Sequence, residues 1–550
     1  MKTKDFSGTG MMRALLCMTL LTLHASCFTA MAQDTDTTRV EQLGEVVVKA
    51  VRGQRNAPFA VSNIRKKDLQ EFSKTGRELP FLFAQTPGVL AWSENGLGTG
   101  TTYMRIRGAA GSRINVTLDG VPLNSPEDQT VFWANMNSYG SLLGSVQIQR
   151  GVGSSTNGDG AFGGTIALGT ALPRETFGAE VNFSYGSYNT MNVGGQFSSG
   201  AIPLGVGRLM IEGAYHQTTT DGFIHGTRGR SGSYYGALTW LKDKLQLSYK
   251  NIGNFERTGQ AWNGVTAGDN DLSLMDGTYG AKTGIKTYKD LWNVGLGRYN
   301  TLYETLTYDA DGNFAKDADG NYITERYRMS DGSYWDRTTD NFWQNHNLLT
   351  ATGQWAEHWT ATATLHYTYG YGYYEEFRPN NKLSKYGLPT SADASGKTVK
   401  RTDFVRKKGL RQDVAGIVGN VNYKDELWDI IGGLSAQYFW GDHFGYLTYT
   451  ARPELRGKDG GYIHKYYDSK AEKLDASAFI KAQLHLSRQF DIFGDLQLRQ
   501  VNYKTDGKND KFYEETSGYF NQLLDIDKHY TFFNPKAGFS WQPTPQDRIY

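Results

Sequence analysis

The feature that most constrains the fold is the spacing of the connections in the sequence after Arg174. In this part, short segments alternate apolar and polar residues, as at Val181, Phe183 and Tyr185. Such alternation predicts β-strands with two chemically different faces. Short and long connections follow one another in strict turn, which predicts an antiparallel sheet with one tight edge and one elaborate edge. After an initial tip at 186–189, the short connections are 201–207, 242–244, 355–358, 424–426, 487–489 and 543–547, and the long ones are roughly 218–231, 252–341, 375–410, 442–471 and 504–531.

These connections favour a transmembrane β-barrel over a soluble fold. A soluble sandwich or propeller also alternates, but compact domains rarely carry structureless loops of this length. Outer-membrane barrels have short turns on one side of the membrane and long loops on the other. A helical membrane protein is excluded, because no stretch beyond residue 32 approaches the roughly 18 apolar residues that a spanning helix needs. About twelve strands fit before Tyr550, with a thirteenth starting at 548–550, so we expect an incomplete barrel.

The N-terminal segment has the order of a secretory signal peptide. Arg13 is followed by the mostly apolar run Ala14–Leu23 and by the small-residue site Ala30–Ala32. This order predicts that residues 1–32 are removed after export. Cleavage as a lipoprotein before Cys27 is the alternative, but His24 stands where a large aliphatic residue is usual.

Composition and motifs argue against an enzyme and against a nucleic-acid-binding protein. Both cysteines, Cys17 and Cys27, lie in the segment expected to be removed, which leaves no disulfide and no thiolate metal site. A formal net charge of only +2 suggests no nucleic-acid partner. The segment 309–321 fails the EF-hand spacing, and its two Asp-Gly pairs predict hairpin turns instead. Without a nucleophile or zinc-protease motif, we expect no catalytic residue, no bound metal and no cofactor.

Residues 43–172 predict a compact α/β unit with short apolar strands, Gly-rich turns and helical segments around 77–85. Its motifs, in order, are Leu43–Val48, Leu79–Val89, Met104–Gly108, Val116–Asn124, Val146–Gly151 and Gly160–Leu168. In this order they resemble the TonB-dependent outer-membrane receptors. The resemblance implies an N-terminal α/β plug domain over 51–172, inside a transmembrane antiparallel β-barrel of about 22 strands. Residues 173–550 would then be the N-terminal portion of that barrel.

The resemblance also implies a partner on the periplasmic side. The family carries a TonB box soon after the signal peptide, and a leader over 33–50 contains the matching residues Leu43, Gly44, Glu45, Val46, Val47 and Val48. An extended segment of this kind can add as a strand to the C-terminal domain of TonB, which belongs to an inner-membrane energising complex. The same valines would also suit an ordinary plug strand.

Two plug arginines are implied to face the barrel wall. Family members pair arginines at the corresponding motif positions with acidic wall residues, which makes Arg107 and Arg150 our candidates. An arginine buried at such an interface requires a carboxylate partner. The alternative is an arginine solvated in a wet lumen.

A ligand from outside would meet the long barrel loops and two plug loops, 93–101 and 122–133. Flat aromatic rings and arginine bind rigid chelates at a low cost in conformational entropy. Most such residues could equally belong to the lipid-facing aromatic belt or to loop packing. The candidate ligand contacts are Trp92, Trp133, Trp262, Tyr373, Tyr374, Phe377, Arg378 and Trp440.

The function implied by the resemblance is energised uptake of a scarce nutrient across the outer membrane of a Gram-negative bacterium, with the plug blocking the lumen at rest. The box follows the signal peptide almost directly, without the extra domain common in glycan importers, so an iron-siderophore chelate is favoured. Haem, cobalamin and an oligosaccharide are the alternatives within the family. A passive porin or an adhesin is the alternative outside it.

Overall fold

The computed structural model describes residues 59–153, 155, 162–264, 285, 287–392, 395–455, 464–515, 518–544 and 546–550. The chain separates into two units, 1–42 and 43–550, and every described residue belongs to the second unit. The expected signal peptide (1–32), the leader (33–50) and the box Leu43–Val48 lie outside the described residues and stay predictions. Among the described residues, no helix is long and apolar enough to cross a membrane.

The N-terminal α/β part is built on a five-stranded sheet in the order β1-β6-β7-β4-β5. All its pairs are antiparallel except β4 with β7. A separate hairpin pairs β2 with β3. The elements of this part are β1 (Ala60–Arg65), α3 (Lys66–Ser73), α4 (Leu79–Phe83), β2 (Val89–Ser93), β3 (Thr102–Ile106), η2 (Gly111–Arg113), β4 (Ile114–Leu118), β5 (Val121–Pro122), η3 (Trp133–Met136), η4 (Tyr139–Ser141), β6 (Leu143–Arg150) and β7 (Gly164–Thr170).

Both helices of this part close one apolar core. Helix α4, which lies in the segment expected to be helical, starts with Pro80 in its first turn, where a missing N–H costs nothing. Helix α3, which the sequence did not lead us to expect, buries only Leu69 and Phe72 along one face. The core they cover reaches into the second part of the molecule, because it includes Ile252 of β13.

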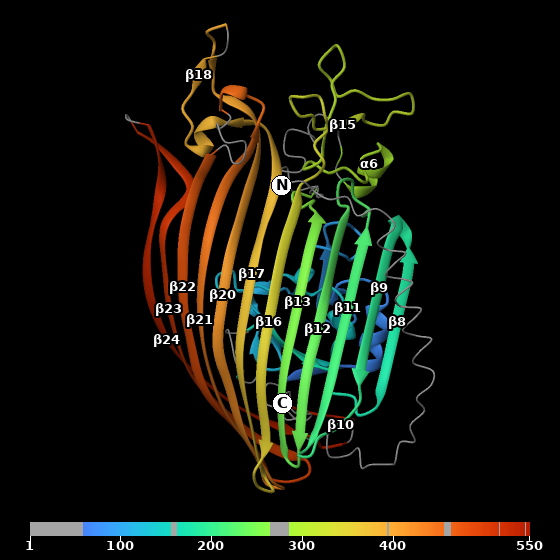
Figure 1. Cartoon of the computed structure of the whole chain (residues 1–550), viewed down its shortest axis with the longest axis vertical. Coiled ribbons are helices and arrows are strands. Elements are labelled where there is room, and N and C mark those ends of the chain that lie inside the picture. Colours follow the sequence, from blue (N-terminus) through green and yellow to red (C-terminus); the bar gives the residue numbers. More distant parts are fainter. Residues whose placement is uncertain are drawn as a thin grey trace. The chain divides into compact units, whose positions relative to one another are not determined.

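The second part is one large antiparallel sheet, which we call the wall. Its twelve-strand path runs β24-β23-β22-β21-β20-β17-β16-β13-β12-β11-β9-β8, and β10 pairs only with β11. The predicted fold class and number of strands are thereby confirmed (Figure 1). Its strands are β8 (Phe177–Gly186), β9 (Thr190–Ser199), β10 (Ile202–Pro203), β11 (Arg208–Thr220), β12 (Gly229–Lys242), β13 (Leu245–Gly259), β16 (Thr339–Gln354), β17 (Trp359–Lys382), β20 (Arg401–Lys424), β21 (Trp428–Thr450), β22 (His464–His485), β23 (Phe490–Glu515) and β24 (Gly518–Trp541).

Three of the long connections are shorter than the sequence suggested. The segments expected as loops at 375–410, 442–471 and 504–531 are largely strand, since β17 continues to Lys382 and β23 to Glu515. Beyond the membrane a strand has water on both faces, so its apolar alternation disappears and its sequence looks like a loop. The connection between β13 and β16 is a real insertion.

That insertion, the external subdomain (residues 287–338), has its own small core around Leu291, Leu296 and Tyr322. It contains α6 (Tyr288–Asn293), β14 (Glu304–Leu306) and β15 (Thr324–Arg326). The two hairpin turns expected at 309–321 are present, closed by Asp309 N to Asn313 O and Asp317 N to Asn321 O, both 2.9 Å. A third turn of the same kind, at 329–333, was not foreseen.

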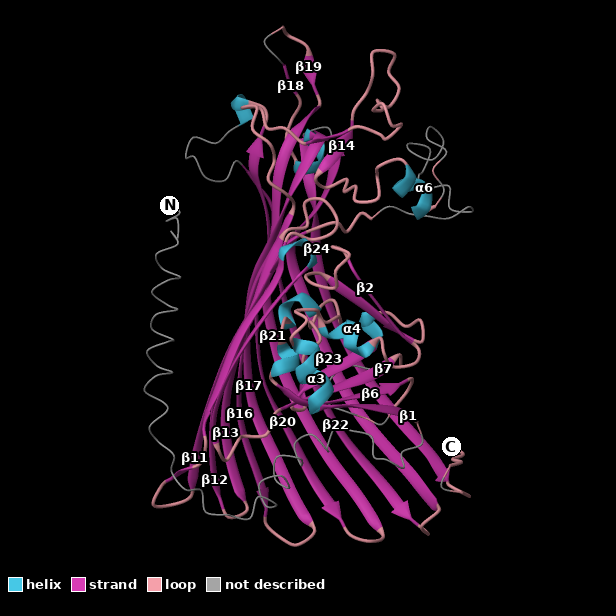
Figure 2. Ribbon diagram, turned by 90° about the vertical axis from the view of Figure 1, so that its right-hand side faces the viewer, coloured by secondary structure: helices cyan, strands magenta, loops and turns pink. Residues whose placement is uncertain are grey.

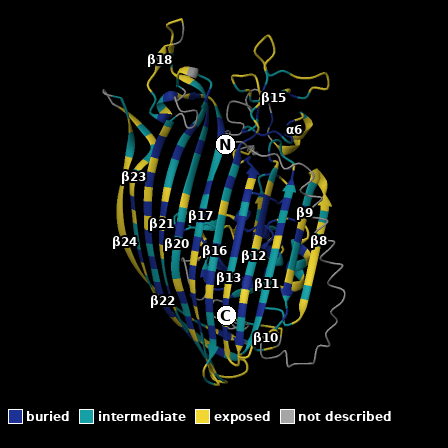
Figure 3. Ribbon diagram, viewed as in Figure 1, coloured by how far each residue is buried: buried dark blue, intermediate teal, exposed yellow. Residues whose placement is uncertain are grey.

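Exposed and buried residues alternate along the wall strands (Figure 3), and the α/β part lies on the inward side of the wall (Figure 2). Leu349 pairs with Leu365 across β16 and β17, and these side chains are 52% and 54% exposed on the outward face. The next pair, Thr350 and Thr364, is buried on the inward face, where the two hydroxyls are 3.0 Å apart. This is the reverse of a soluble protein and fits a wall between lipid and a polar lumen.

Aromatic rings mark two levels on the outward face. At the upper level Trp343 and Phe444 each stack on Tyr371, with ring centroids 6.2 Å apart. At the lower level Trp359 lies near Trp355 and Tyr423. Tyr371 and Trp359 are twelve residues apart on β17, and twelve residues of a strand tilted by about 45° rise about 28 Å, close to the apolar thickness of a bilayer.

Candidate functional site

The plug is fastened to the wall by an ion pair at Asp119, a residue in the turn after β4. Its Oδ2 lies 2.7 Å from Nζ of Lys250 on β13, and it also accepts hydrogen bonds from the Thr170 backbone and hydroxyl. Burial alone would raise the pKa of the Asp119 carboxyl, but the Lys250 charge and these hydrogen bonds lower it below its ordinary value. The Asp119 carboxylate is therefore charged at neutral pH, and its bonds to Lys250 and Thr170 hold the end of β7 against β13.

A second fastening lies at the plug loop 122–133. Oε2 of Glu127 is 2.9 Å from Nε2 of His443 on β21, and the Tyr503 hydroxyl donates to Oε1 at 2.9 Å. Nζ of Lys473 donates to the carbonyl of Pro126 at 2.9 Å. In both fastenings the plug supplies the carboxylate and the wall supplies the donor or the cation.

The two arginines expected to pair with the wall lie elsewhere. Arg107 is exposed, with a left-handed φ of 49°. Arg150 donates from Nη1 to the Pro87 carbonyl inside the plug, at 3.0 Å. Within the described part of the chain, neither has an ion pair with a wall carboxylate. Their pairing with the wall stays a prediction, whereas the pairs the structure describes run in the opposite sense, from plug acid to wall cation. Asp119 lies in the motif Val116–Asn124, so the sequence offered the acid, but nothing in it singled out Lys250.

The plug loop 93–101 meets the outer ends of the wall strands. Oε2 of Glu94 accepts from the Ala261 backbone at 2.9 Å, and the Thr101 hydroxyl donates to Gln260 at 3.0 Å. The carbonyl of Asn95 accepts from the backbone of Phe223 at 2.9 Å. This loop is therefore positioned by the connections that follow β11 and β13.

Four of the eight candidate ligand contacts are placed in the plug core or on the outward side of the wall. Trp133 is only 4% exposed and packs edge-on against Phe83 in the plug core. Phe377 is buried under Tyr327 and Trp335 of the external subdomain. Tyr373 and Trp440 belong to the outward set, which is the alternative given for them above: Tyr373 neighbours Trp343, and Trp440 neighbours Tyr438.

The other four candidates lie in more accessible positions. Trp92 stacks on Tyr103 in the β2–β3 hairpin, with centroids 5.5 Å apart, and is 41% exposed. Trp262, directly after β13, packs edge-on against Tyr374 of β17 at 5.4 Å. Arg378 lies farther along β17 than Tyr374, on the same inward face, and forms an ion pair with Glu376.

A cluster of cations surrounds Glu376 near the outer end of β17. Arg378 and Arg406 approach its two carboxylate oxygens at 2.6 and 2.7 Å, and Glu376 is only 1% exposed while both arginines remain partly open to solvent. Burial first, and then the charges of Arg378, Arg406, Lys382 and Arg401, lower the pKa of the Lys385 ammonium. One carboxylate thus faces several cations, and the local field favours an anion.

The sequence did not predict most residues of this cationic cluster. Only Arg378 was among the candidates. The sequence predicts a loop over 375–410, and Arg406 falls within it, so the inward position of Arg406 beside Glu376 does not follow from the sequence. The β20 register, which includes a bulge between Val405 and Arg406 in its pairing with β21, sets which cations face inward.

Within the described ranges, no group of three or more His, Cys, Asp or Glu side chains is arranged to hold a metal ion. A cavity of about 70 Å³ separates the plug loop 122–136 from the wall and is lined by His346, His366 and Thr368. His346 shares a hydrogen bond of 2.9 Å with the Thr368 hydroxyl. The cavity is large enough for a few water molecules.

Comparison with known families and structures gives consistent results. The model of the TonB-dependent receptor plug domain matches residues 53–165. The ferric yersiniabactin uptake receptor FyuA from Yersinia pestis is similar in structure, with a TM-score of 0.56 and 14% identity over 91% of this chain and 65% of that one. The closed form of the ferric-catecholate import receptor Fiu from E. coli K12 gives 0.60 and 14% over 94% and 66%. The ferric citrate transporter FecA gives 0.58 and 13% over 94% and 64%.

At these identities the structural likeness establishes the fold alone. The chain spans about two thirds of the length of these receptors. No curated protein matches the sequence.

Proposed function

We propose, from the plug-domain match at residues 53–165, that the chain is a TonB-dependent receptor and that it imports a scarce nutrient across the outer membrane, most simply an anionic iron-siderophore chelate. Residues 51–172 would form the plug and 173–550 the N-terminal portion of the barrel, after removal of a signal peptide near Ala32. The C-terminal domain of TonB would bind Leu43–Val48 and pull on the plug.

The observation that carries the choice of ligand is the cationic cluster at Glu376. Arg378 and Arg406 are held rigidly by the same buried carboxylate, so their guanidinium groups are oriented before a ligand arrives. Trp262 and Tyr374 lie beside them, and Arg406 also lies 5.8 Å from the centroid of the Tyr374 ring. Fixed cations next to flat rings suit an anionic chelate with aromatic or planar ligand groups. The similar receptors named for ferric yersiniabactin, ferric catecholate and ferric citrate support the same class.

A neutral oligosaccharide would gain little from such a cluster, and a passive porin would not need it. Haem and cobalamin are the alternatives if none of the three iron chelates in the test below is taken up. The lipid of the outer membrane would contact the outward face of the wall, including its aromatic levels.

The first test deletes residues 43–48 in the full-length protein and measures uptake of radioiron supplied as ferric citrate, a ferric catecholate and a ferric hydroxamate. We expect surface binding of one chelate to survive and its uptake to fall to background, because the handle for TonB is gone. Uptake that continues after the deletion, or that ignores the proton-motive force, would support a passive porin and refute the proposal.

The second test replaces Arg406 by Gln. Loss of one charge-assisted contact should weaken binding of the anionic chelate roughly tenfold. Arg411→Gln is the matched control, because Arg411 is on the same strand but is 57% exposed on the outward face. Equal binding by both variants would refute the anionic ligand site.

A further inference from the structure

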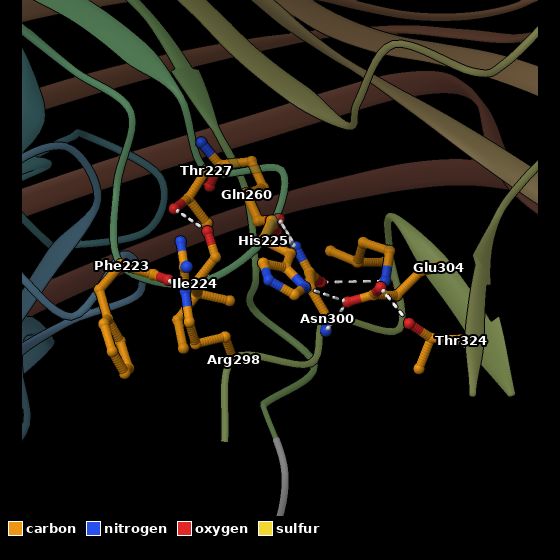
Figure 4. Close-up of polar contacts among 10 residues, drawn as sticks. Phe223, Ile224, His225, Thr227, Gln260, Arg298, Asn300, Glu304 and Thr324 are labelled. Carbon is orange, nitrogen blue, oxygen red and sulfur yellow. Dashed lines mark hydrogen bonds and ion pairs between the residues drawn. The ribbon is translucent and has the colours of Figure 1, made fainter. Parts of the chain in front are cut away.

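The loop between β11 and β12, residues 221–228, lies between two parts that the sequence places far apart. On one side is the plug loop 93–101, and on the other is the external subdomain (287–338). Figure 4 shows Phe223, Ile224 and His225 of this loop beside Arg298, Asn300 and Glu304 of the subdomain. We call residues 221–228 the strap.

On the plug side, the strap is bound through its backbone and through one close packing contact. The N–H groups of Phe223 and Ile224 both donate to the carbonyl of Asn95, at 2.9 and 3.3 Å. Gly96 has a φ of +77°, and a Cβ added there would lie 2.9 Å from the Phe223 ring. Only glycine combines that backbone conformation with so close an approach. The plug loop is thus seated directly on Phe223.

On the subdomain side, Phe223 is bound a second time and His225 is bound as well. Nε of Arg298 donates to the Phe223 carbonyl at 2.5 Å, and the His225 N–H donates to the Arg298 carbonyl at 2.9 Å. Nδ1 of His225 lies 2.8 Å from Oε1 of the buried Glu304. The other oxygen of Glu304 accepts from the Thr324 hydroxyl at 2.8 Å.

Asn300 connects the subdomain to both ends of the plug loop. Its Nδ2 donates to the His225 carbonyl at 2.7 Å and to the Gln260 carbonyl at 3.0 Å, and its Oδ1 accepts from the Leu302 N–H at 3.0 Å. The strap that holds the first of these carbonyls also donates backbone hydrogen bonds to Asn95. Gln260, which holds the second, accepts a hydrogen bond from the Thr101 hydroxyl through its side chain. Asn300 is 4% exposed, so its amide has no water to replace these partners.

Ring packing reinforces the same connection. The Phe223 ring stacks on Trp292 of the subdomain with centroids 6.2 Å apart, and the Arg298 guanidinium lies over both Tyr188 and Phe223. A Cβ on Gly226 would lie 2.5 Å from the Tyr303 ring. From Phe223 to His225, every backbone donor and acceptor is engaged, since the Ile224 carbonyl accepts from Thr227 at 2.6 Å.

We propose that the strap couples the external subdomain to the plug loop 93–101, and that Asn300 and Glu304 are the positioning residues of this coupling. Neither part can shift against the strap without breaking several of these hydrogen bonds, so displacement of the subdomain by an arriving ligand is passed to the top of the plug. The inference rests on the proposed function for its purpose, while the mechanical link itself needs no ligand.

The link can be tested by hydrogen exchange on the ligand-free, full-length protein. In Asn300→Ala, the amides of residues 93–101 should exchange about fivefold to tenfold faster, because the side chain of Asn300 reaches that loop through His225 and Gln260. Asn313→Ala is the matched control, because Asn313 is exposed at a hairpin tip of the same subdomain. Protection of the Ala315 and Ile323 amides, which bond within the subdomain, shows that the variant still folds.

The reverse direction gives an independent test, because coupling between two sites is reciprocal. Gly96→Ala should speed exchange of the His225 amide and of residues 298–304 in the subdomain. Gly108→Ala is the control, since Gly108 has a similar φ of +81° in the plug but open space around a Cβ. Unchanged exchange across the strap in both experiments would overturn the coupling.

These measurements are separate from import. Transmission across the strap in a protein that imports none of the three iron chelates would leave the coupling standing and refute the proposed ligand class. Import that is unaffected by Asn300→Ala, in a variant whose plug loop does exchange faster, would overturn the role of the coupling in transport.

Discussion

The plug and the wall solve the problem of burial in opposite ways. The plug has an ordinary apolar core, with Leu69, Phe83 and Ile106 fully buried. In the wall, leucines such as Leu365 are exposed and threonines such as Thr364 are buried. Which side chains are buried therefore depends on the medium around each part of the chain. That medium is protein for the plug core and lipid for the outward face of the wall.

The strongest test of this contrast compares the same substitution in both regions. Leu69→Ala leaves a cavity in the plug core and should cost about 2 to 5 kcal/mol of plug stability. Leu365→Ala, on the outward face, should cost less than about 1 kcal/mol, because lipid fills the space. Urea titration followed by exchange of the β6 amides measures the first, and loss of the heat-resistant barrel form on a gel measures the second. Equal costs would show that the outward face is packed against protein.

The next test probes depth on the outward face. Leu365→Arg should destabilise the folded wall by about 2 to 4 kcal/mol, because the charge lies near the middle of the apolar band. Tyr371→Arg, at the upper aromatic level, should cost about 0 to 1 kcal/mol, since its side chain reaches the interface. Refolding into lipid vesicles at increasing urea concentration gives both values. Similar costs at the two positions would contradict the assigned membrane span.

The smallest expected effect concerns a buried acid of the plug. Burial raises the pKa of the Glu78 carboxyl well above its ordinary value, although Asn137 and the Gly100 backbone donate to it. A carboxyl with a raised folded pKa binds more protons when folded, so plug stability falls as pH rises above the unfolded value. Glu78→Gln keeps the accepting oxygen and removes the charge. It should stabilise the plug by about 1 to 3 kcal/mol at pH 8 and have little effect at pH 4.

Urea titrations at the two pH values measure the effect of Glu78→Gln. Glu71→Gln is a suitable control, because Glu71 is exposed on α3. A stabilisation that is the same at pH 4 and pH 8 would show that the charge of Glu78 is not the cause.

The sequence predicts the architecture well, because the period of two survives wherever one strand face meets lipid. The strand count, the tight turns and the two hairpins at 309–321 are confirmed for this reason. It fails at the outer ends of β17, β20 and β23, where both faces are wet and the alternation that identifies a strand is absent. Helix α3 was missed because eight residues with two buried side chains carry too little periodicity.

The site was less predictable than the fold. Which cation faces the lumen depends on register and on bulges such as the one at Val405 and Arg406, and neither is written in composition. Asp119 and Lys250 are 131 positions apart, so only the folded chain shows their pairing. The acidic turn Asp119–Gly120 is the sequence feature that indicates a plug residue able to pair with a wall cation.

The paired hydroxyls on the inward face have one more consequence. Thr350 with Thr364, Thr352 with Thr362, and Ser435 with Ser477 lie 3.0 to 3.2 Å apart, and in each pair either oxygen can donate. A surface of reversible donors has no preferred direction and can trade each bond for water at nearly constant energy. Such a lining offers little resistance to a group that moves along it, whereas the ion pairs at Asp119 and Glu127 resist movement of the plug against the wall.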